Sequence, residues 1–198
     1  MTTAASVAHT KPQPSGKSHS RWPLVLGLLL FLAPLAWATG FTVLSAGTQL
    51  DQNVYRLDAV IDYDLSTVAK EALNNGVPLT IQMQMQVLRT REWLWDETIA
   101  DIQQRYRLEY HALARQYLVT NLNNGELNSF PSRESAIEFL GRVRDFPLLD
   151  NSLLKPGDNY YGRLRVRLDI EDLPAPLRPI AYLSTDWRLT SAWYIWPL

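Results

Sequence analysis

Residues 79–87 read Leu-Thr-Ile-Gln-Met-Gln-Met-Gln-Val, and this stretch decides the fold of the chain. Apolar side chains occupy every second position, and Thr or Gln fills each position between them. A period of two is the pattern of a β-strand that buries one face and leaves the other in water. The stretch therefore predicts a half-buried strand, with the glutamines on the solvated face.

The same alternation recurs on both sides of this stretch. Upstream, residues 55–65 alternate apolar side chains with Arg and Asp. Downstream, residues 106–110 and 162–170 alternate apolar or aromatic side chains with charged ones. Asn124-Gly125 is a strong hairpin signal inside a three-stranded meander that we expect from Trp93 to about Phe130. Each of these patterns predicts a strand of an antiparallel sheet.

Two short helices should interrupt the strands. Ser66 can cap a helix that ends near residues 74–76, and Pro131-Ser132 opens a second helix whose apolar side extends to Val143. Seven or more short strands, two helices and no strand–helix–strand rhythm predict a mainly β fold. We expect an antiparallel, two-sheet, immunoglobulin-like β-sandwich over residues 50–198.

An uncharged stretch precedes this domain, from Trp22 to Leu44. As a helix it would be roughly 35 Å long, whereas the hydrocarbon core of a bilayer is roughly 30 Å thick. Lys11, Lys17 and Arg21 come before it without any acidic residue, which favours a cytoplasmic N-terminus. The sequence thus predicts one transmembrane helix over residues 21–44, with the bilayer as a partner.

Several features refine this anchor hypothesis. Trp22 and Trp37 lie near the ends of the stretch, where indoles prefer the membrane interface, and residues 1–20 should form a disordered cytoplasmic leader. The alternative is a signal peptide, because Ala36-Trp37-Ala38 is an A-x-A pattern that could be cleaved after Ala38. The apolar character that continues to Leu44 favours a retained anchor. Both interpretations export the C-terminal domain, so we expect a single-pass protein of the bacterial inner membrane with a periplasmic domain.

Composition excludes several classes of function. From Ser45 on, the chain holds all 20 acidic residues and 16 of the 19 basic ones, so this part is net negative and a poor candidate for binding nucleic acid. The sequence has no Cys, and His111 is the one His after the leader. These residues cannot form an ordinary zinc site or a Cys–His pair. With no G-x-S-x-G motif and no glycine-rich phosphate loop, we expect no metal, no cofactor and no catalytic residue.

One candidate contact site is the arginine ladder, which comprises Arg163, Arg165 and Arg167 on one face of a predicted strand. Three guanidinium groups in a row can bind anionic lipid or an acidic partner surface. The alternative is a solvated face on which these arginines pair with Asp58 and Asp62, and the acidic balance of the domain favours this pairing.

A second candidate contact site is Trp93 with Trp95. Two residues apart on a strand, they would share one face, either in the core or in an aromatic patch for a protein or glycan. Asp96, Glu97 and Asp101 follow them, and an acidic pair beside tryptophans is typical of glycosidases. No pair of carboxylates is singled out by its spacing.

The chain resembles a proteobacterial family classified only as a domain of unknown function, of the DUF4390 type. The resemblance rests on Tyr55-Arg56-Leu57, Trp93-Leu94-Trp95, residues 105–108, residues 183–189 and the ending Trp193-Tyr194-Ile195-Trp196-Pro197-Leu198. It implies a basic leader, one anchor and an exported domain, and it brings no activity and no catalytic residues. Members are often encoded beside a membrane sensor kinase, which implies a role in envelope signalling.

These observations predict a non-catalytic, membrane-anchored adaptor or accessory module that binds another envelope protein through a strand edge or an aromatic patch. Two alternatives stay open: a carbohydrate- or peptidoglycan-binding module that uses Trp93 and Trp95, and a hydrolase built on carboxylates.

Overall fold

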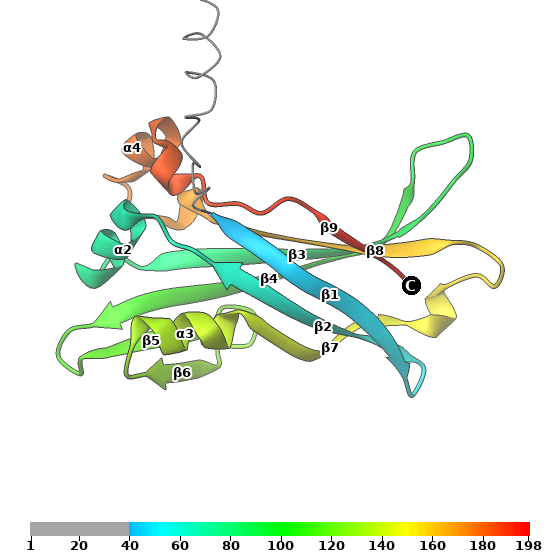
Figure 1. Ribbon diagram of the computed structural model, residues 1–198, viewed down its shortest axis with the longest axis horizontal. Helices are drawn as coiled ribbons and strands as arrows, with labels where there is room; N and C mark the ends of the chain where they lie inside the picture. The colour runs from blue at the N-terminus through cyan, green and yellow to red at the C-terminus, as the bar shows by residue number, and fades with distance from the viewer. Residues whose placement is uncertain (1–39) are drawn as a thin grey trace, which may run out of the picture. The chain divides into compact units, whose positions relative to one another are not determined.

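The computed structural model describes residues 40–198 (Figure 1). The predicted leader over residues 1–20, the interfacial Trp22 and Trp37, and most of the predicted anchor lie outside the described residues. Within residues 40–198, no helix combines the length and the apolar character needed to cross a bilayer.

The domain is mainly β and is built from two antiparallel sheets, as the alternating patterns predict. The three-stranded sheet has the order β1-β2-β7 and contains β1 (Phe41–Asp51), β2 (Val54–Tyr63) and β7 (Arg142–Asp150). The six-stranded sheet has the order β6-β5-β4-β3-β8-β9 and contains β6 (Leu127–Phe130), β5 (Gln116–Asn121), β4 (Glu97–His111), β3 (Leu79–Arg89), β8 (Tyr160–Leu168) and β9 (Tyr194–Pro197). The predicted meander is confirmed as β4-β5-β6, with Gly125 in the left-handed conformation at its second turn.

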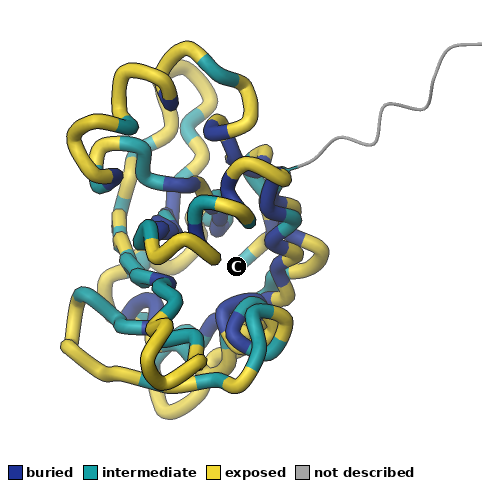
Figure 2. Tube along the Cα trace, turned by 90° about the vertical axis from the view of Figure 1, so that its left-hand side faces the viewer, coloured by how far each residue is buried: buried dark blue, intermediate teal, exposed yellow. Residues whose placement is uncertain are grey.

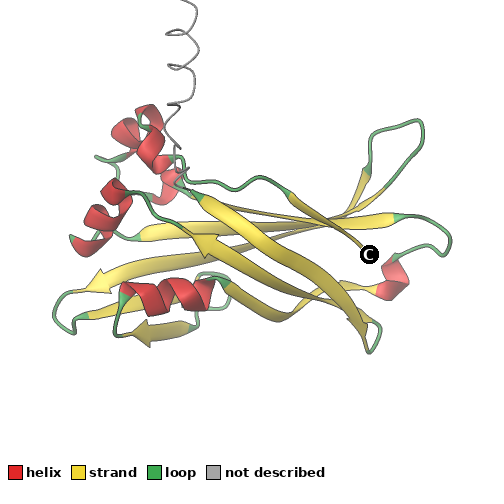
Figure 3. Cartoon of the chain, viewed as in Figure 1, coloured by secondary structure: helices red, strands yellow, loops and turns green. Residues whose placement is uncertain are grey.

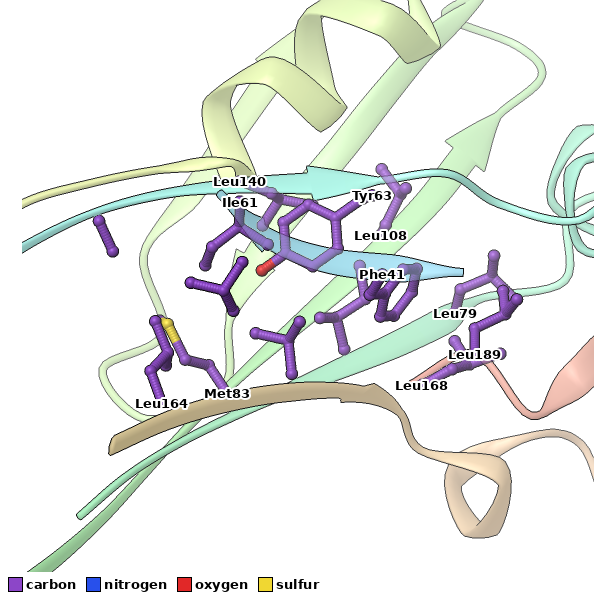
Figure 4. Packing of buried hydrophobic residues seen from close by; sticks show 14 of the residues in the cluster. Phe41, Ile61, Tyr63, Leu79, Met83, Leu108, Leu140, Leu164, Leu168 and Leu189 are labelled. Atoms are coloured by element: carbon purple, nitrogen blue, oxygen red, sulfur yellow. The ribbon is translucent and has the colours of Figure 1, made fainter. Parts of the chain in front are cut away.

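The core lies between the two sheets and follows from the period-two pattern. On β2, Leu57 and Ile61 are buried, whereas Asp58 and Asp62 on the opposite face are exposed. Figure 4 shows side chains from both sheets meeting in one apolar layer, including Ile61 on one side and Leu164 on the other. Figure 2 shows the buried positions in the interior and the exposed ones along the outer loops. Apolar burial of this kind is the main favourable contribution to folding.

Both predicted helices are confirmed at their N-termini. Ser66 caps α2 (Thr67–Asn74) by accepting a hydrogen bond of 3.1 Å from the backbone N–H of Ala69. Ser132 caps α3 (Arg133–Leu140) in the same way, with the N–H of Ser135 at 3.2 Å.

The C-terminal side of α3 differs from the prediction, since Val143 belongs to β7 and not to the helix. Gly141 ends the helix and lies so close to β2 that an added Cβ would be 2.5 Å from the carbonyl oxygen of Ile61. A third helix, α4 (Arg178–Leu183), begins within a segment that holds Pro174, Pro176 and Pro179. Figure 3 shows α2 and α4 at one end of the sheets.

The start of the domain also differs from the prediction. Strand β1 begins at Phe41, which pairs with Tyr63 and is buried in the core together with Val43. The sandwich therefore starts upstream of residue 50, and Phe41 and Val43 belong to its core, whereas Leu44 is exposed on the outer face of β1. The continuity of apolar residues up to Leu44 consequently no longer distinguishes a retained anchor from a cleaved signal peptide.

Strand β3 departs from the predicted pattern of one buried and one solvated face. Its inward side chains are buried as expected, but Gln82 on the outward face is only 5% exposed and Gln86 is equally covered. The prediction of a wet glutamine face is wrong because side chains from both neighbouring strands lie over it. This covered polar face leads to the candidate site.

Candidate functional site

The arginine ladder lies on the outer face of the six-stranded sheet, directly beside the glutamines of β3. In the register of β8 with β3, the partners are Arg163 with Gln86, Arg165 with Gln84, and Arg167 with Gln82. Each guanidinium group donates to the amide oxygen of its partner, at 2.7 Å from Arg163 Nε, 3.1 Å from Arg165 Nη2, and 2.9 and 2.7 Å from Arg167 Nε and Nη2.

The glutamines use their amide nitrogens toward β4. Gln82 Nε2 donates to Gln103 Oε1 at 2.7 Å. Gln84 and Gln86 both donate to the carboxylate of Asp101, with the closest approach at 2.7 Å from Gln86. Each glutamine thus accepts from an arginine on one side and donates on the other, which fixes the orientation of its amide and of the guanidinium group beside it.

The pairing of the ladder with the aspartates of β2, which the sequence favours, is wrong. Asp58 and Asp62 lie in the other sheet, and Asp58 accepts a hydrogen bond from the backbone N–H of Asp145 at 3.0 Å. Arg105 and Arg107 of β4 have other acidic partners, as described below. Among residues 40–198, none of the ion pairs involves a ladder arginine. Because its partners are neutral amides, the ladder keeps its positive charge.

Trp193 covers part of the ladder. Its ring lies 4.5 Å from the guanidinium carbon of Arg163 and 4.5 Å from that of Arg165. Cation–π contacts of this kind hold the arginine planes without neutralising them. The outer face thus combines three oriented cations, a row of amides and one indole.

Arg105 and Arg107, also on this face, have acidic partners. Arg105 Nη2 lies 3.2 Å from Asp169 Oδ2 and 3.5 Å from Asp172 Oδ1, and Arg107 Nη2 lies 3.6 Å from Asp172 Oδ2. A hydrogen bond of 2.5 Å from Thr80 Oγ1, assisted by these arginines, lowers the pKa of Asp172 below its ordinary value. Among the arginines of β4 and β8, those of the ladder are therefore the ones without an acidic partner.

Trp93 and Trp95 form the tip of the loop between β3 and β4, together with Leu94; we call these three residues the WLW tip. Both indoles are 92% exposed, and Leu94 is exposed as well. The prediction that the two tryptophans share one face of a strand is wrong, because β3 ends at Arg89 and β4 begins at Glu97. The loop projects from one end of the sheets (Figure 1).

Ion pairs and hydrogen bonds hold the base of this loop. Arg89 and Arg91 both donate to the carboxylate of Glu97, and the hydrogen bond from Arg91, with a second from Arg89, lowers the pKa of Glu97. The hydroxyl of Tyr161 donates to Asp96 at 2.6 Å, which raises the pKa of that tyrosine. The structure thus holds the base of the loop by ion pairs of Arg89 and Arg91 with Glu97, while it leaves three large apolar side chains at the tip in water.

The carboxylates considered for a hydrolase are engaged in such contacts. Asp96, Glu97 and Asp101 accept the hydrogen bonds described above, and Asp64 pairs with Lys70 at 3.1 Å. His111 ends β4, where its Nδ1 accepts from the backbone N–H of Ala114 at 3.2 Å. In the part of the chain that the structure describes, no three His, Cys, Asp or Glu side chains are grouped so that they could hold a metal ion.

Comparison with known families identifies the chain over residues 38–197, where it matches the family described as "Domain of unknown function (DUF4390)". The protein belongs to this family. The match covers most of the chain and confirms the resemblance inferred from the sequence. No curated protein and no solved structure matches the chain.

In this DUF4390 protein, the two candidate contact sites are separate features: the ladder lies on a sheet face and the WLW tip lies at a sheet end. The contacts that organise the ladder, made by the β3 glutamines, Asp101 and Trp193, were not predicted from the sequence. The sequence did carry a signal for the glutamines of β3, because Gln82, Gln84 and Gln86 at alternate positions give a strand face that is polar but uncharged. A strand face that is fully solvated more often carries charged residues.

Proposed function

We propose that this DUF4390-family protein is a non-catalytic, membrane-anchored adaptor or accessory module of the bacterial periplasm that binds another envelope protein. The observation that carries the proposal is the WLW tip, where two fully exposed indoles and a leucine stand on a loop whose base is held by ion pairs. Soluble domains rarely expose adjoining large apolar side chains unless these side chains contact a partner.

The magnitude of the exposed surface supports this role. An indole buries roughly 150–250 Å² in a contact, and at about 25 cal/mol per Å² each of Trp93 and Trp95 offers roughly 4–6 kcal/mol before the costs of association. Tryptophans are the residues most enriched at the energetic centres of protein interfaces. Because the base of the loop is already fixed, less conformational entropy is lost when a partner binds.

The arginine ladder supplies a second contact surface of different chemistry. Its three guanidinium groups are oriented by neutral amides and keep their charge, so they suit an acidic partner surface. A membrane sensor kinase, implied by the resemblance of the family, is one candidate for the partner. An anchor that ends before β1 would hold the domain close to such a protein, so a weak contact would suffice.

We also propose that the sandwich is of the immunoglobulin-like class. Its strand orders, β1-β2-β7 and β5-β4-β3-β8-β9, match the orders A-B-E and C″-C′-C-F-G of the variable-type immunoglobulin fold, with β6 as an addition. In this correspondence the WLW tip occupies the C–C′ connection, at the end opposite the B–C, C′–C″ and F–G loops that bind antigen in variable domains.

Site-directed photocrosslinking in intact cells tests the proposal. A photoreactive amino acid replaces Trp93 or Trp95 in the full chain, and Leu113 serves as the matched control because it is 95% exposed at the β4–β5 turn. We expect both loop positions to give the same discrete adduct with one envelope protein and Leu113 to give none. Equal adduct patterns from all three positions would contradict a specific contact.

A glycan-binding module is the second candidate, because it also requires Trp93 and Trp95 to face solvent, as they do. Co-sedimentation of the purified full chain with isolated peptidoglycan separates the two functions. If sedimentation is strong and is lost in Trp93→Ala while no protein adduct forms, the glycan function replaces the adaptor function.

A further inference from the structure

The end of the sandwich opposite the WLW tip carries a second exposed apolar patch, on α4. Leu183 is 87% exposed, Ile180 is 61% exposed and Tyr182 is also exposed, whereas Ala181 packs into the core. A single exposed apolar residue needs no explanation, but three within four consecutive positions form a patch. We call Ile180, Tyr182 and Leu183 the α4 patch.

This patch lies at the end of the domain where the described chain begins. A Cβ added to Gly40 would lie 4.0 Å from the carbonyl oxygen of Thr190, shortly after α4 in the sequence. Figure 1 likewise shows α4 beside the start of β1, far from the β3–β4 loop. The sequence immediately before Gly40, back to Trp22, contains no charged residue.

Positive charge surrounds the same end. A cleft of about 400 Å³ is lined in part by Arg165, Arg167 and Arg188. Arg188 donates to the carbonyl oxygen of Tyr182 at 2.7 Å, and the exposed Arg178 of α4 donates to that of Leu173 at 2.8 Å. None of these four arginines takes part in the ion pairs of residues 40–198.

The acidic groups nearby do not cancel this charge. Asp169 and Asp172 are paired with Arg105 and Arg107, as described above. Glu171 accepts a hydrogen bond from Tyr182, and Asp186 accepts one from Ser184 at 3.1 Å. A third acid, the exposed Glu71, lies on α2, which packs against residues 185–187, and it has no ion pair within residues 40–198. Three acids without an ion-pair partner therefore lie near four such arginines, which leaves a small excess of positive charge around α4.

We infer that the α4 end docks on the anionic surface of the bilayer, with the α4 patch in the headgroup region and the arginines on lipid phosphates. Exposed apolar residues flanked by arginines are the combination that binds anionic membrane surfaces. The inference rests on the proposed membrane anchor, because an anchor that ends at Gly40 would bring this end to the membrane. It goes beyond the adaptor function by fixing the orientation of the domain: the WLW tip points away from the bilayer.

Charge favours lipid over two other candidate occupants of the α4 patch, namely residues 22–39 of the chain and a second copy of the protein. Residues 22–39 of the chain contain no acidic group and cannot complement the arginines. A second copy docked through the same end would bring like charges together. An anionic lipid surface matches both parts, because the headgroup–acyl boundary accepts the apolar side chains and the phosphates accept the arginines.

A single-cysteine experiment tests the inference, since the chain has no native Cys to replace. Leu183→Cys carries an environment-sensitive fluorophore in the full chain, reconstituted into vesicles of phosphatidylcholine with or without phosphatidylglycerol. Leu153→Cys is the matched control, because Leu153 is exposed and lies at the opposite end of the sheets, just after the β7 residue that pairs with Val54. We expect a blue shift at position 183 and about a two-fold quenching by a nitroxide placed in the headgroup region, stronger with phosphatidylglycerol and absent at position 153.

A second variant tests the electrostatic part. Arg178→Gln combined with Arg188→Gln should lower the quenching at position 183 about two-fold and remove its dependence on phosphatidylglycerol. A fluorophore at 183 that stays in water overturns the inference. A blue shift without quenching by the lipid-borne nitroxide overturns it as well, because residues 22–39 or a second copy then cover the patch.

This inference and the adaptor function can fail separately. If position 183 stays in water while Trp93 still captures one envelope protein, the docked orientation fails and the adaptor function stands. If the lipid-borne nitroxide quenches the fluorophore at position 183 while Trp93 and Trp95 capture no protein, the docked orientation stands and the adaptor function fails.

Discussion

The two faces of strand β3 are buried to almost the same extent, yet they have opposite chemistry. Inward, Met83 and Met85 contact only the apolar core between the sheets. Outward, Gln82 and Gln86 are covered by arginines of β8 and accept their hydrogen bonds. The comparison shows that burial has two different roles on this strand. The inner face stabilises the fold, and the outer face orients cations without neutralising them.

The inner face should show the largest response to substitution. Met85 is fully buried, so Met85→Ala should lower the free energy of unfolding by about 2–5 kcal/mol, through lost apolar burial and the cavity that remains. Urea denaturation of the purified protein measures this change. A loss below about 1 kcal/mol would mean that the inner face is not the rigid core that the comparison assumes.

The outer face should respond through its hydrogen bonds. Gln86→Leu keeps a similar size but leaves Arg163 Nε and the Asp101 carboxylate each without one partner, so we expect a loss of about 1–3 kcal/mol. Gln84→Leu is the matched control, because Gln84 is more exposed and water can replace its bonds. Equal losses in the two variants would show that the burial of Gln86 carries no penalty.

Acid titration should reveal a smaller effect at the margin of the same face. The pKa of Asp172 is lower in the folded protein than its ordinary value of 3.8, chiefly because of the hydrogen bond from Thr80. The folded state therefore binds fewer protons, and the resulting stability is present above the ordinary pKa and is lost as the pH falls through it toward the folded pKa.

Asp172→Asn should consequently be less stable than the wild-type protein at neutral pH, and its unfolding free energy should decline less steeply below about pH 4. Denaturation across a pH series measures both slopes. If the unfolding free energies of the two proteins fall with the same slope as the pH decreases, folding does not lower the pKa of Asp172.

The WLW tip, beyond the end of β3, should have the smallest effect on stability. Trp93→Ser and Trp95→Ser remove exposed side chains, so the unfolding free energy should change by less than about 0.5 kcal/mol. Photocrosslinking from the remaining tryptophan position should nevertheless lose its adduct. A clear loss of stability would show that the tip packs on the domain and is not held out for a partner.

The sequence predicted those parts of the fold that depend on local periodicity and caps. The alternation in β2, the meander of β4 to β6, and the caps at Ser66 and Ser132 are all confirmed. It misplaced β1, because Phe41 and Val43 continue an apolar stretch and a sandwich core requires the same side chains as a membrane helix. Apolar character alone does not distinguish these environments.

The candidate site was less predictable because it depends on register between strands distant in the sequence. The arginines were identified, but their partners come from β3, and only the pairing of β8 with β3 brings Gln82 to Arg167. Trp93 and Trp95 were identified as well, but their spacing suggested a strand where the chain forms a loop. The cation–π contact of Trp193 has no signal in the local sequence.

Labelling with a membrane-impermeant maleimide tests the central claim most directly, namely that an exported domain presents the WLW tip to a partner. Leu94→Cys and Leu113→Cys are each made in the full chain and labelled in cells with a permeabilised outer membrane, then compared with the purified proteins. The account predicts rapid labelling of Leu113→Cys in cells and several-fold slower labelling of Leu94→Cys, which a partner covers. Labelling of either position only after lysis, or equal rates at both, would contradict it.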